Sequence, residues 1–236
     1  MIILAMDTSG PVAGVAILRD GKLAYEGAAV NKMTQSVNMM PMVEEALTRS
    51  GLDIADIDLF AAVTGPGSFT GVRIGVTAVK GMAHGAGKPC IGIDALEALA
   101  SGTFAAQGIL CPIQDARAGQ VYGAAFRSGM PPVRILPDMA EKLTEYLNKV
   151  QEAAGSDEKL FFVGDGVATY RQAITDQLGE RAVFAPEHCS YLRPAAVAML
   201  AHMRQQEAVD YLTLAPVYLR APQAERARAA KEAAKQ

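Results

Sequence analysis

The sequence predicts an α/β protein made of two similar lobes. The order of apolar, strand-like segments and amphipathic, helix-like segments in residues 1–106 begins again after residue 107, and such alternation is typical of layered α/β folds. Each half also opens with an apolar strand that ends in an aspartate, Asp7 in the first and Asp115 in the second. Because the halves share almost no identical residues, the predicted duplication rests on this pattern alone.

The amino-acid composition is that of an ordinary globular protein. The chain has 236 residues, of which 50% are hydrophobic and 20% are charged, enough for a substantial core. Its formal net charge of −3 lacks the basic surplus typical of nucleic-acid-binding proteins. The apolar N-terminal run breaks at Asp7, so we expect no signal peptide and no membrane anchor. Three widely spaced cysteines fit reduced thiols in a cytoplasmic protein.

The first half contains a hairpin signal and two helix patterns. Asp20-Gly21 lies between two apolar stretches, as in a tight β-hairpin. Apolar residues at three- and four-residue steps predict a first helix that ends at Gly51, with a kink or restart at Pro41. The predicted elements are a strand over 2–7, a hairpin over 12–28, a helix over 37–50, a strand over 56–65, a helix over 72–86, and a strand and a helix within 88–101.

The second half follows a similar order. We predict a strand, a turn and a strand over 109–129, a helix over 139–155, a strand over 159–163 that ends in a glycine-rich turn, helices over 168–179 and 193–206, and an extended piece over 214–222. These segments divide the chain into an N-terminal lobe (1–106), a C-terminal lobe (107–222) and a charged tail (223–236).

The glycine-rich stretch TGPGSFTGVRIGVTAVKG, residues 64–81, superficially resembles a phosphate-binding loop. It lacks the Gly-Lys-Ser/Thr ending of a P-loop, and Ser68 lacks the pattern around a nucleophilic serine. Amide groups at a helix N-terminus can still attract anions. Each glycine inside a helix costs about 1 kcal/mol relative to alanine, so we favour a packing role for Gly71 and Gly75.

Several motifs together resemble those of the TsaB (YeaZ) family over essentially the whole chain. These are Asp7-Thr8-Ser9, GPGSFTGVRIG at 65–75, DARAGQVY at 115–122, VGDGV at 163–167 and PVYLR at 216–220. The resemblance implies a duplicated two-lobed ASKHA fold, the RNase H-like fold of actin, sugar kinases and the Hsp70 ATPase. It also implies a non-catalytic subunit that binds and activates TsaD, which transfers threonylcarbamoyl to the adenosine beside the anticodon of ANN-decoding tRNAs.

The resemblance also implies partners and an interface. The expected partners are a TsaD-like catalytic subunit, a TsaE-like ATPase and, for the chain alone, a second copy; tRNA is contacted only indirectly and a membrane not at all. Flexible methionine thioethers suit such an interface, and Arg73, poorly placed for the helix dipole, indicates either an acidic partner or a solvated side chain. The predicted interface residues are Met39, Met40, Val43, Leu47, Val72, Arg73, Gly75, Val76, Val79 and Met82.

Asp7 and Asp115 are the candidate cofactor-binding residues. Paired carboxylates across a cleft could hold a hydrated Mg²⁺, or each could only bond the backbone of its own turn. Both interpretations stay open for Asp7, while the turn role is favoured for Asp115. Gly164-Asp165-Gly166 is interpreted as a turn or as the remnant of an adenosine-binding loop. We expect no tightly bound cofactor, with ATP or ADP and Mg²⁺ at the shared interface as the alternative.

Catalysis by this chain is not expected. TsaD carries two metal-binding histidines on a helix whose counterpart here has Ala95 and Leu99, and neither side chain can bind a metal. His84, His188 and His202 form no pair with metal-ligand spacing. The alternative functions are a free-standing ASKHA-fold ATPase or small-molecule kinase, and a peptidase-like hydrolase, for which the sequence offers no nucleophile.

Overall fold

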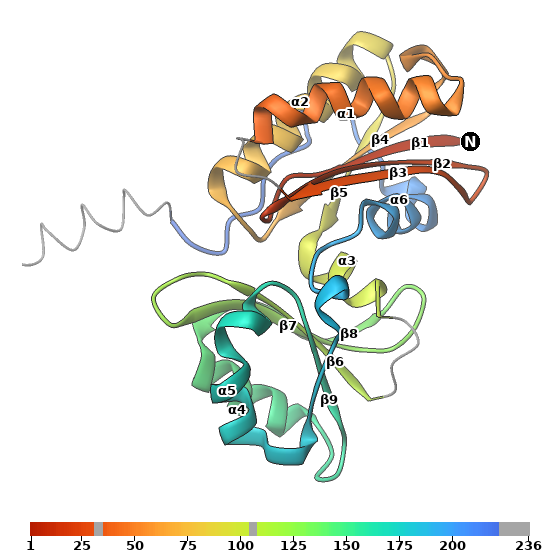
Figure 1. Ribbon diagram of the computed structural model, residues 1–236. Coiled ribbons are helices and arrows are strands. Elements are labelled where there is room, and N and C mark those ends of the chain that lie inside the picture. Colours follow the sequence, from red (N-terminus) through yellow and green to blue (C-terminus); the bar gives the residue numbers. More distant parts are fainter. Residues whose placement is uncertain (31–34, 104–107, 222–236) are drawn as a thin grey trace, which may run out of the picture.

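The protein consists of two mixed β-sheets, each flanked by helices (Figure 1). The computed structural model describes residues 1–30, 35–103 and 108–221. The first half contains β1 (Ile2–Asp7), β2 (Val12–Arg19), β3 (Lys22–Val30), α1 (Gln35–Ser50), β4 (Leu59–Gly65), α2 (Phe69–Ala86), β5 (Cys90–Asp94) and α3 (Ala95–Ser101). The second contains β6 (Ile109–Asp115), β7 (Gln120–Arg127), β8 (Val133–Lys142), α4 (Leu143–Ala153), β9 (Leu160–Val163), α5 (Gly166–Leu178), β10 (Ala182–Phe184) and α6 (Pro194–Met203).

The two sheets repeat one topology. Their strand orders are β3-β2-β1-β4-β5 and β10-β9-β6-β7-β8. In the first, β1 pairs antiparallel with β2 and parallel with β4. In the second, β6 pairs in the same two ways with β7 and β9. The predicted duplication is therefore confirmed, and Asp7 and Asp115 end equivalent strands.

The sheet of the first lobe is buried on both faces. Leu4 and Met6 of β1 belong to the apolar cluster that includes residues of α1 and α2. Ile3 and Ala5 alternate with them and belong to a second cluster, which lies between the two sheets. Strands buried on both faces are apolar at nearly every position, which explains why the segment Ile2–Met6 shows no polar alternation.

Helices α3 and α6 lie between the two sheets (Figure 1), and this placement corrects the predicted lobe boundary. Residues 107–222 were expected to form the C-terminal lobe, but α6 packs against β1 and β2 of the first lobe. Farther along, Val209 pairs with Cys90 of β5, and the Val217 amide donates to the Thr64 carbonyl at 2.8 Å. The sequence of α6 is apolar on nearly all sides, as in helices buried between layers.

Three details of the second half and of α1 differ from expectation. Residues 133–142 form strand β8, and the helix that was predicted to begin at residue 139 begins at Leu143. Pro137 lies within β8, where it is tolerated because β8 is an edge strand. Strand β10 was not predicted. Helix α1 continues through Pro41 as one element. The predicted tail, 223–236, lies outside the described residues.

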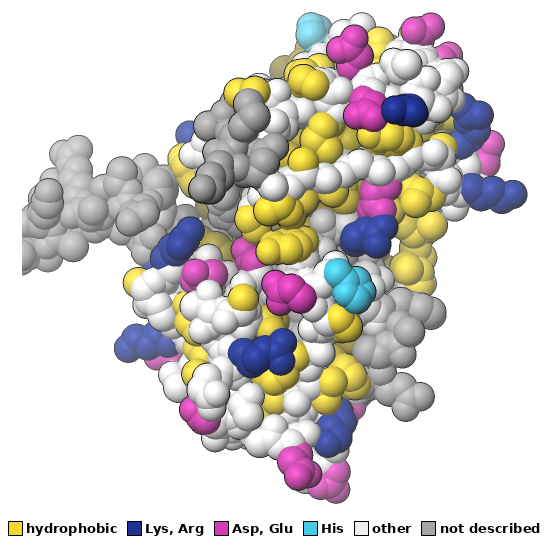
Figure 2. All heavy atoms as spheres, viewed as in Figure 1, with side chains coloured by type: hydrophobic (Ala, Val, Ile, Leu, Met, Phe, Trp, Pro, Cys, Tyr) yellow, Lys and Arg dark blue, Asp and Glu magenta, His cyan; other side chains and the backbone are white. Residues whose placement is uncertain are grey.

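The face drawn in Figure 2 carries charges of both signs. On the face in Figure 2, acidic and basic side chains are interspersed. Within the described ranges, no helix is long and apolar enough to cross a membrane. The mixed surface agrees with the small net charge of the chain.

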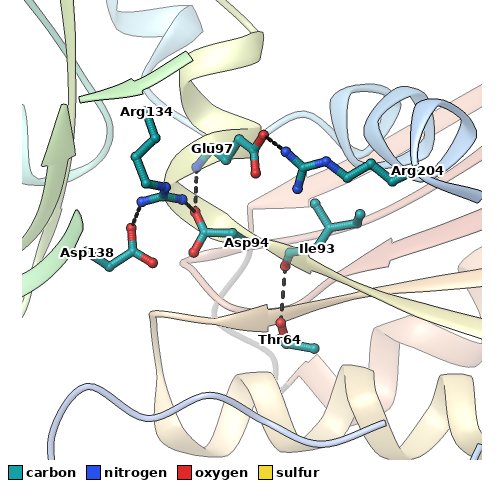
Figure 3. A network of polar contacts seen from close by, with 7 residues as sticks. All are labelled: Thr64, Ile93, Asp94, Glu97, Arg134, Asp138 and Arg204. Carbon is teal, nitrogen blue, oxygen red and sulfur yellow. Dashed lines mark hydrogen bonds and ion pairs between the residues drawn. The ribbon is translucent and has the colours of Figure 1, made fainter. Parts of the chain in front are cut away.

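A partly buried polar network joins the lobes (Figure 3). Arg134 of β8 bonds Asp94 at 3.1 Å and also pairs with Asp138. Asp94 caps α3 by accepting the Glu97 amide at 2.7 Å. Glu97 in turn pairs with Arg204, directly after α6. Burial, with a further contribution from Asp138, raises the pKa of Asp94 to about 8.

We predict that Asp94→Asn weakens the pH dependence of stability. A carboxyl with a pKa near 8 keeps its proton in the folded chain, whereas the unfolded chain releases it near its ordinary value of 3.8. Stability should therefore fall as pH rises from about 4 to 8, by at most about 1.4 kcal/mol per pH unit from this group. Urea unfolding at pH 5 and pH 8 should show a smaller difference for Asp94→Asn than for wild type.

The matched control is Asp157→Asn, since Asp157 is exposed in the second lobe. That variant should keep the wild-type difference between the two pH values. An unchanged pH dependence in Asp94→Asn would show that the folded chain holds no proton at this position.

Candidate functional site

A cleft of about 650 Å³ lies between the lobes. Five chain segments line it. They are the turn after β1, the turn between β4 and α2, the turn between β6 and β7, the turn between β9 and α5, and residues 217–221 near the end of the described chain. Asp115 and Asp165 are among its lining residues, and Asp7 lies next to Ser9 and Gly10 in a smaller adjoining space.

Asp7 shapes the turn after β1. It is 2% exposed, and its Oδ1 accepts hydrogen bonds from the Ser9 amide at 2.8 Å and the Ser9 hydroxyl at 2.7 Å. Burial raises the pKa of Asp7 to about 6, and the charge of Asp165 adds to the rise. The turn role is thus observed for Asp7, and the cofactor role stays a prediction.

Asp115 makes the equivalent turn in the second lobe. Its Oδ1 accepts the Arg117 amide at 2.8 Å and the Tyr170 hydroxyl at 3.0 Å. This geometry confirms the favoured turn role. Arg117 and Ala118 both adopt positive φ, 66° and 54°, in the tight turn that follows.

Asp165 was considered from the sequence only as part of the Gly164-Asp165-Gly166 turn or remnant adenosine-binding loop, and not as a candidate site residue. Its carboxylate accepts the Asp115 amide at 3.3 Å, and burial raises the pKa of Asp165. The repeat of the fold could have pointed to Asp165, because Gly164-Asp165-Gly166 lies at the end of β9 as Gly65-Pro66-Gly67 lies at the end of the equivalent β4. Gly164 and Gly65 even share a positive φ, 114° and 124°.

The glycines at the start of α2 allow the helix to approach the turn after β1. Thr8 Oγ1 donates to the Gly71 carbonyl at 2.7 Å, and Ser68 caps the helix by accepting the Gly71 amide. A Cβ at Gly71 would lie 2.0 Å from the Thr8 carbonyl oxygen, and one at Gly75 would lie 2.6 Å from Thr8 Oγ1. Both glycines therefore pack against the turn after β1 of the chain itself, although Gly75 was predicted to lie at the partner interface.

Burial corrects which of the predicted interface side chains can contact a partner. Most of them pack inside the first lobe, because a three- to four-residue spacing marks the buried stripe of a helix whatever covers it. At the surface, Met40 is 50% exposed, Arg73 is exposed and Leu47 is half-buried. The buried members are Met39, Val43, Val72, Gly75, Val76, Val79 and Met82. The interface itself stays a prediction.

Arg73 takes part in an aromatic stack at the edge of the cleft. Its Nε donates to the Tyr218 hydroxyl at 2.7 Å, and its guanidinium lies 3.9 Å from the centroid of the Phe69 ring. Both rings line the cleft. Because its two neighbours are aromatic, Arg73 has a stabilising environment within the chain, and an acidic partner for it stays a prediction.

Ala95 and Leu99, the positions at which the resemblance to TsaD implied metal ligands in that relative, are buried here. Ala95 and Leu99 lie in the apolar cluster between the sheets. Over residues 1–30, 35–103 and 108–221, no three His, Cys, Asp or Glu side chains are grouped so that they could hold a metal ion.

Comparisons with known proteins agree on one family and one fold. A family model described as TsaD, tRNA N6-adenosine threonylcarbamoyltransferase, matches residues 31–228. The tRNA threonylcarbamoyladenosine biosynthesis protein TsaB of Bacillus subtilis (strain 168) is 34% identical over 227 residues, which cover 95% of this chain and 96% of the relative.

Two solved structures show the fold. YeaZ from Pseudomonas aeruginosa superposes with a TM-score of 0.75 at 23% identity, covering 92% of this chain and 99% of that one. The (R)-2-hydroxyglutaryl-CoA dehydratase component A of Acidaminococcus fermentans has a TM-score of 0.51 at 11% identity, covering 87% of this chain and 99% of that one. The ASKHA fold is thereby shown.

We predict that Gly71→Ala destabilises the folded chain, because the added methyl group meets a backbone oxygen. Overpacking of this kind costs typically about 1–3 kcal/mol. Gly81→Ala is the matched control in the same helix, since a Cβ there would meet nothing within 4 Å. The control should gain up to about 1 kcal/mol from helix propensity. Chemical unfolding of both variants gives the two free energies, and equal values would contradict the close approach of α2 to Thr8.

Proposed function

Because the chain belongs to the TsaB (YeaZ) family, whose curated members are named as tRNA threonylcarbamoyladenosine biosynthesis proteins, we propose that it is a non-catalytic subunit of that pathway. In this proposal the chain binds and activates a TsaD-like enzyme. That enzyme transfers a threonylcarbamoyl group to the adenosine beside the anticodon of ANN-decoding tRNAs. The match of the TsaD family model to residues 31–228 supports a shared origin of the two subunits.

The observation that carries the proposal is the outer surface of α1 and α2. These helices contact each other and cover one face of the first sheet (Figure 1). On α1, Val37 and Met40 are 51% and 50% exposed. On α2, Gly81 and Gly85 lie one turn apart, and a Cβ at either position would meet nothing within 4 Å.

Unlike Gly71 and Gly75, these two glycines are not in close contact with any other part of the chain that the structure describes. Each nevertheless costs the helix about 1 kcal/mol relative to alanine. A surface without side chains lets a second helix come close, and a partner that also contacts α1 would cover its exposed apolar side chains. A helical face of a TsaD-like subunit or, in the isolated chain, of a second copy fits this surface.

The absence of catalysis is part of the proposal. Ala95 and Leu99 are buried in the core between the sheets, and none of the described residues that line the cleft is a lysine. A phosphate-binding lysine is a usual requirement for phosphoryl transfer on a glycine-rich loop. These features favour a binding subunit over the alternative of a free-standing ATPase or small-molecule kinase.

The remaining expectations concern ligands and cell compartment. We propose that the isolated chain holds no tightly bound nucleotide, and that ATP or ADP with Mg²⁺ binds at the interface shared with the catalytic subunit. A TsaE-like ATPase would join the complex in the cytoplasm. Contact with tRNA would be indirect, because the net charge is −3 and the face in Figure 2 mixes acidic and basic side chains.

We predict that Gly81→Leu weakens binding to a TsaD-like subunit without unfolding the chain. Leucine improves helix propensity, so the melting temperature should not fall. At a close helix contact, the side chain should reduce affinity at least tenfold, which corresponds to about 1.4 kcal/mol. Calorimetric titration with the purified catalytic subunit measures the change.

Ala173→Leu is the control for added bulk on a helix surface. Ala173 is exposed on α5 of the second lobe, away from α1 and α2. This variant should keep wild-type affinity. Normal binding by Gly81→Leu together with weak binding by Ala173→Leu would contradict the proposal and show that the interface lies on the second lobe.

We also predict that the isolated chain does not turn over ATP. The measurement is phosphate release by the purified chain and by Asp7→Ala. Both rates should equal that of buffer. Hydrolysis that disappears in Asp7→Ala would favour the ATPase or kinase function.

A further inference from the structure

The chain that follows α6 returns along the first lobe to the cleft. We call residues 209–220 the strap; they belong to the blue segment that leads to the grey trace in Figure 1. Val209 and Cys90 exchange two backbone hydrogen bonds, at 2.7 and 2.9 Å. Leu214 is 4% exposed in the cluster that includes residues of α2, and Lys80 of α2 donates to its carbonyl at 2.9 Å. The first half of the strap is therefore fixed on the first lobe.

The second half of the strap crosses the beginning of α2. The Val217 amide donates to the Thr64 carbonyl at 2.8 Å. The Tyr218 hydroxyl accepts the hydrogen bond from Arg73, and the Tyr218 ring centroid lies 4.8 Å from that of Phe69. From Val217 onward the chain lines the cleft as far as the structure describes it. The contacts named so far all join the strap to the first lobe.

Arg220 joins the strap to the second lobe. Its Nη1 donates to the Ala116 carbonyl at 3.0 Å, and a hydrogen bond from a guanidinium is charge-assisted. Ala116 lies in the turn between β6 and β7, where it is 7% exposed and its amide donates to the Gln120 carbonyl at 3.0 Å. The acceptor is thus held in place by its own turn. Arg220 and Ala116 both line the cleft, so their bond connects two of its walls.

Arg220 is held by this neutral acceptor and by no carboxylate among the ion pairs of the described residues. Water competes for a hydrogen bond of this kind, so its net contribution to stability is modest. Segments with few buried apolar contacts are the ones that open locally. Beyond Tyr218 the strap has the composition of such a segment, since Leu219 and Arg220 are both partly exposed.

We propose that Arg220 is a latch that holds the end of the strap across the cleft, and that breaking its bond to Ala116 opens one wall of the cleft. In the closed form, Leu219 and Arg220 are part of that wall. In the open form, the strap stays attached through Val217 and Tyr218 while its end moves away from the second lobe. The apolar core between the sheets does not change, so this opening disrupts far less packing than a separation of the lobes.

The test uses tryptophan fluorescence of the isolated full-length chain, because the natural sequence contains no Trp. Tyr122→Trp places a reporter in the wall of the cleft that belongs to the second lobe. Arg220→Ala in this background should increase quenching by acrylamide about twofold, because quenching follows access of the solute to the ring. Arg220→Lys keeps a donor for the Ala116 carbonyl and should restore most of the protection.

A second reporter, Leu219→Trp, lies on the strap itself and remains informative if Tyr122→Trp fails to fold in a thermal melt. Its emission should shift to longer wavelength when Arg220→Ala is added, since the ring then enters water. An emission that stays unchanged in this pair would contradict release of the strap end.

Arg117→Ala is the matched control. Arg117 also lines the cleft, but its side chain is 86% exposed and its charged partner, Asp115, lies in its own turn. This variant should keep the quenching of its parent. Equal quenching with and without Arg220→Ala would overturn the proposal. Equal increases in Arg117→Ala and Arg220→Ala would also overturn it, by showing that loss of positive charge loosens the cleft. Neither reporter requires a catalytic subunit, so failure here is separate from failure of the proposed function.

Discussion

The arrangement of the whole molecule depends on what is packed between its two sheets. Helices α3 and α6 fill this space, and the apolar cluster around them includes residues from both lobes, such as Ile3 and Phe126. Burial of this cluster supplies the stabilising free energy. The Asp94–Arg134–Asp138 network fixes the relative orientation of the lobes, because hydrogen bonds to the planar guanidinium require a defined geometry. With the lobes held in this way, turns from both of them can form one cleft.

The local sequence pattern predicted those elements of the fold whose conformation is determined by residues close to them in the sequence. The hairpin at Asp20-Gly21, most of the strands and the duplicated order follow from alternation, turn residues and helical spacing. Strand β8 was missed because Pro137 suggests a break, and only the position at the sheet edge makes it acceptable. The return of α6 to the first lobe was missed for another reason. An apolar helix indicates burial, but its sequence does not say which two layers it lies between.

The same distinction holds for the site. Sequence reasoning identified Asp115 as a turn residue and Gly71 as a packing residue, because both roles involve local geometry. It considered Asp165 only as part of a turn or a remnant adenosine-binding loop, and it did not consider Gln114. Both residues are about a hundred or more positions away from Asp7 in the sequence, and only the fold brings them to the same small space beside it. The helical spacing of the predicted interface residues was also ambiguous, since a core stripe and a docking stripe have the same period.

The return of the chain to the first lobe has a consequence for biosynthesis. The first sheet is complete at β5, but α6, which covers its inner face, follows about a hundred residues later. A ribosome that has released only residues 1–106 therefore holds a sheet with an apolar face still open to water. Proteins commonly fold one domain after another as they emerge. In this chain, the lobe made first is also the lobe finished last, and its nascent form depends on the second lobe's completion or on temporary protection of that face.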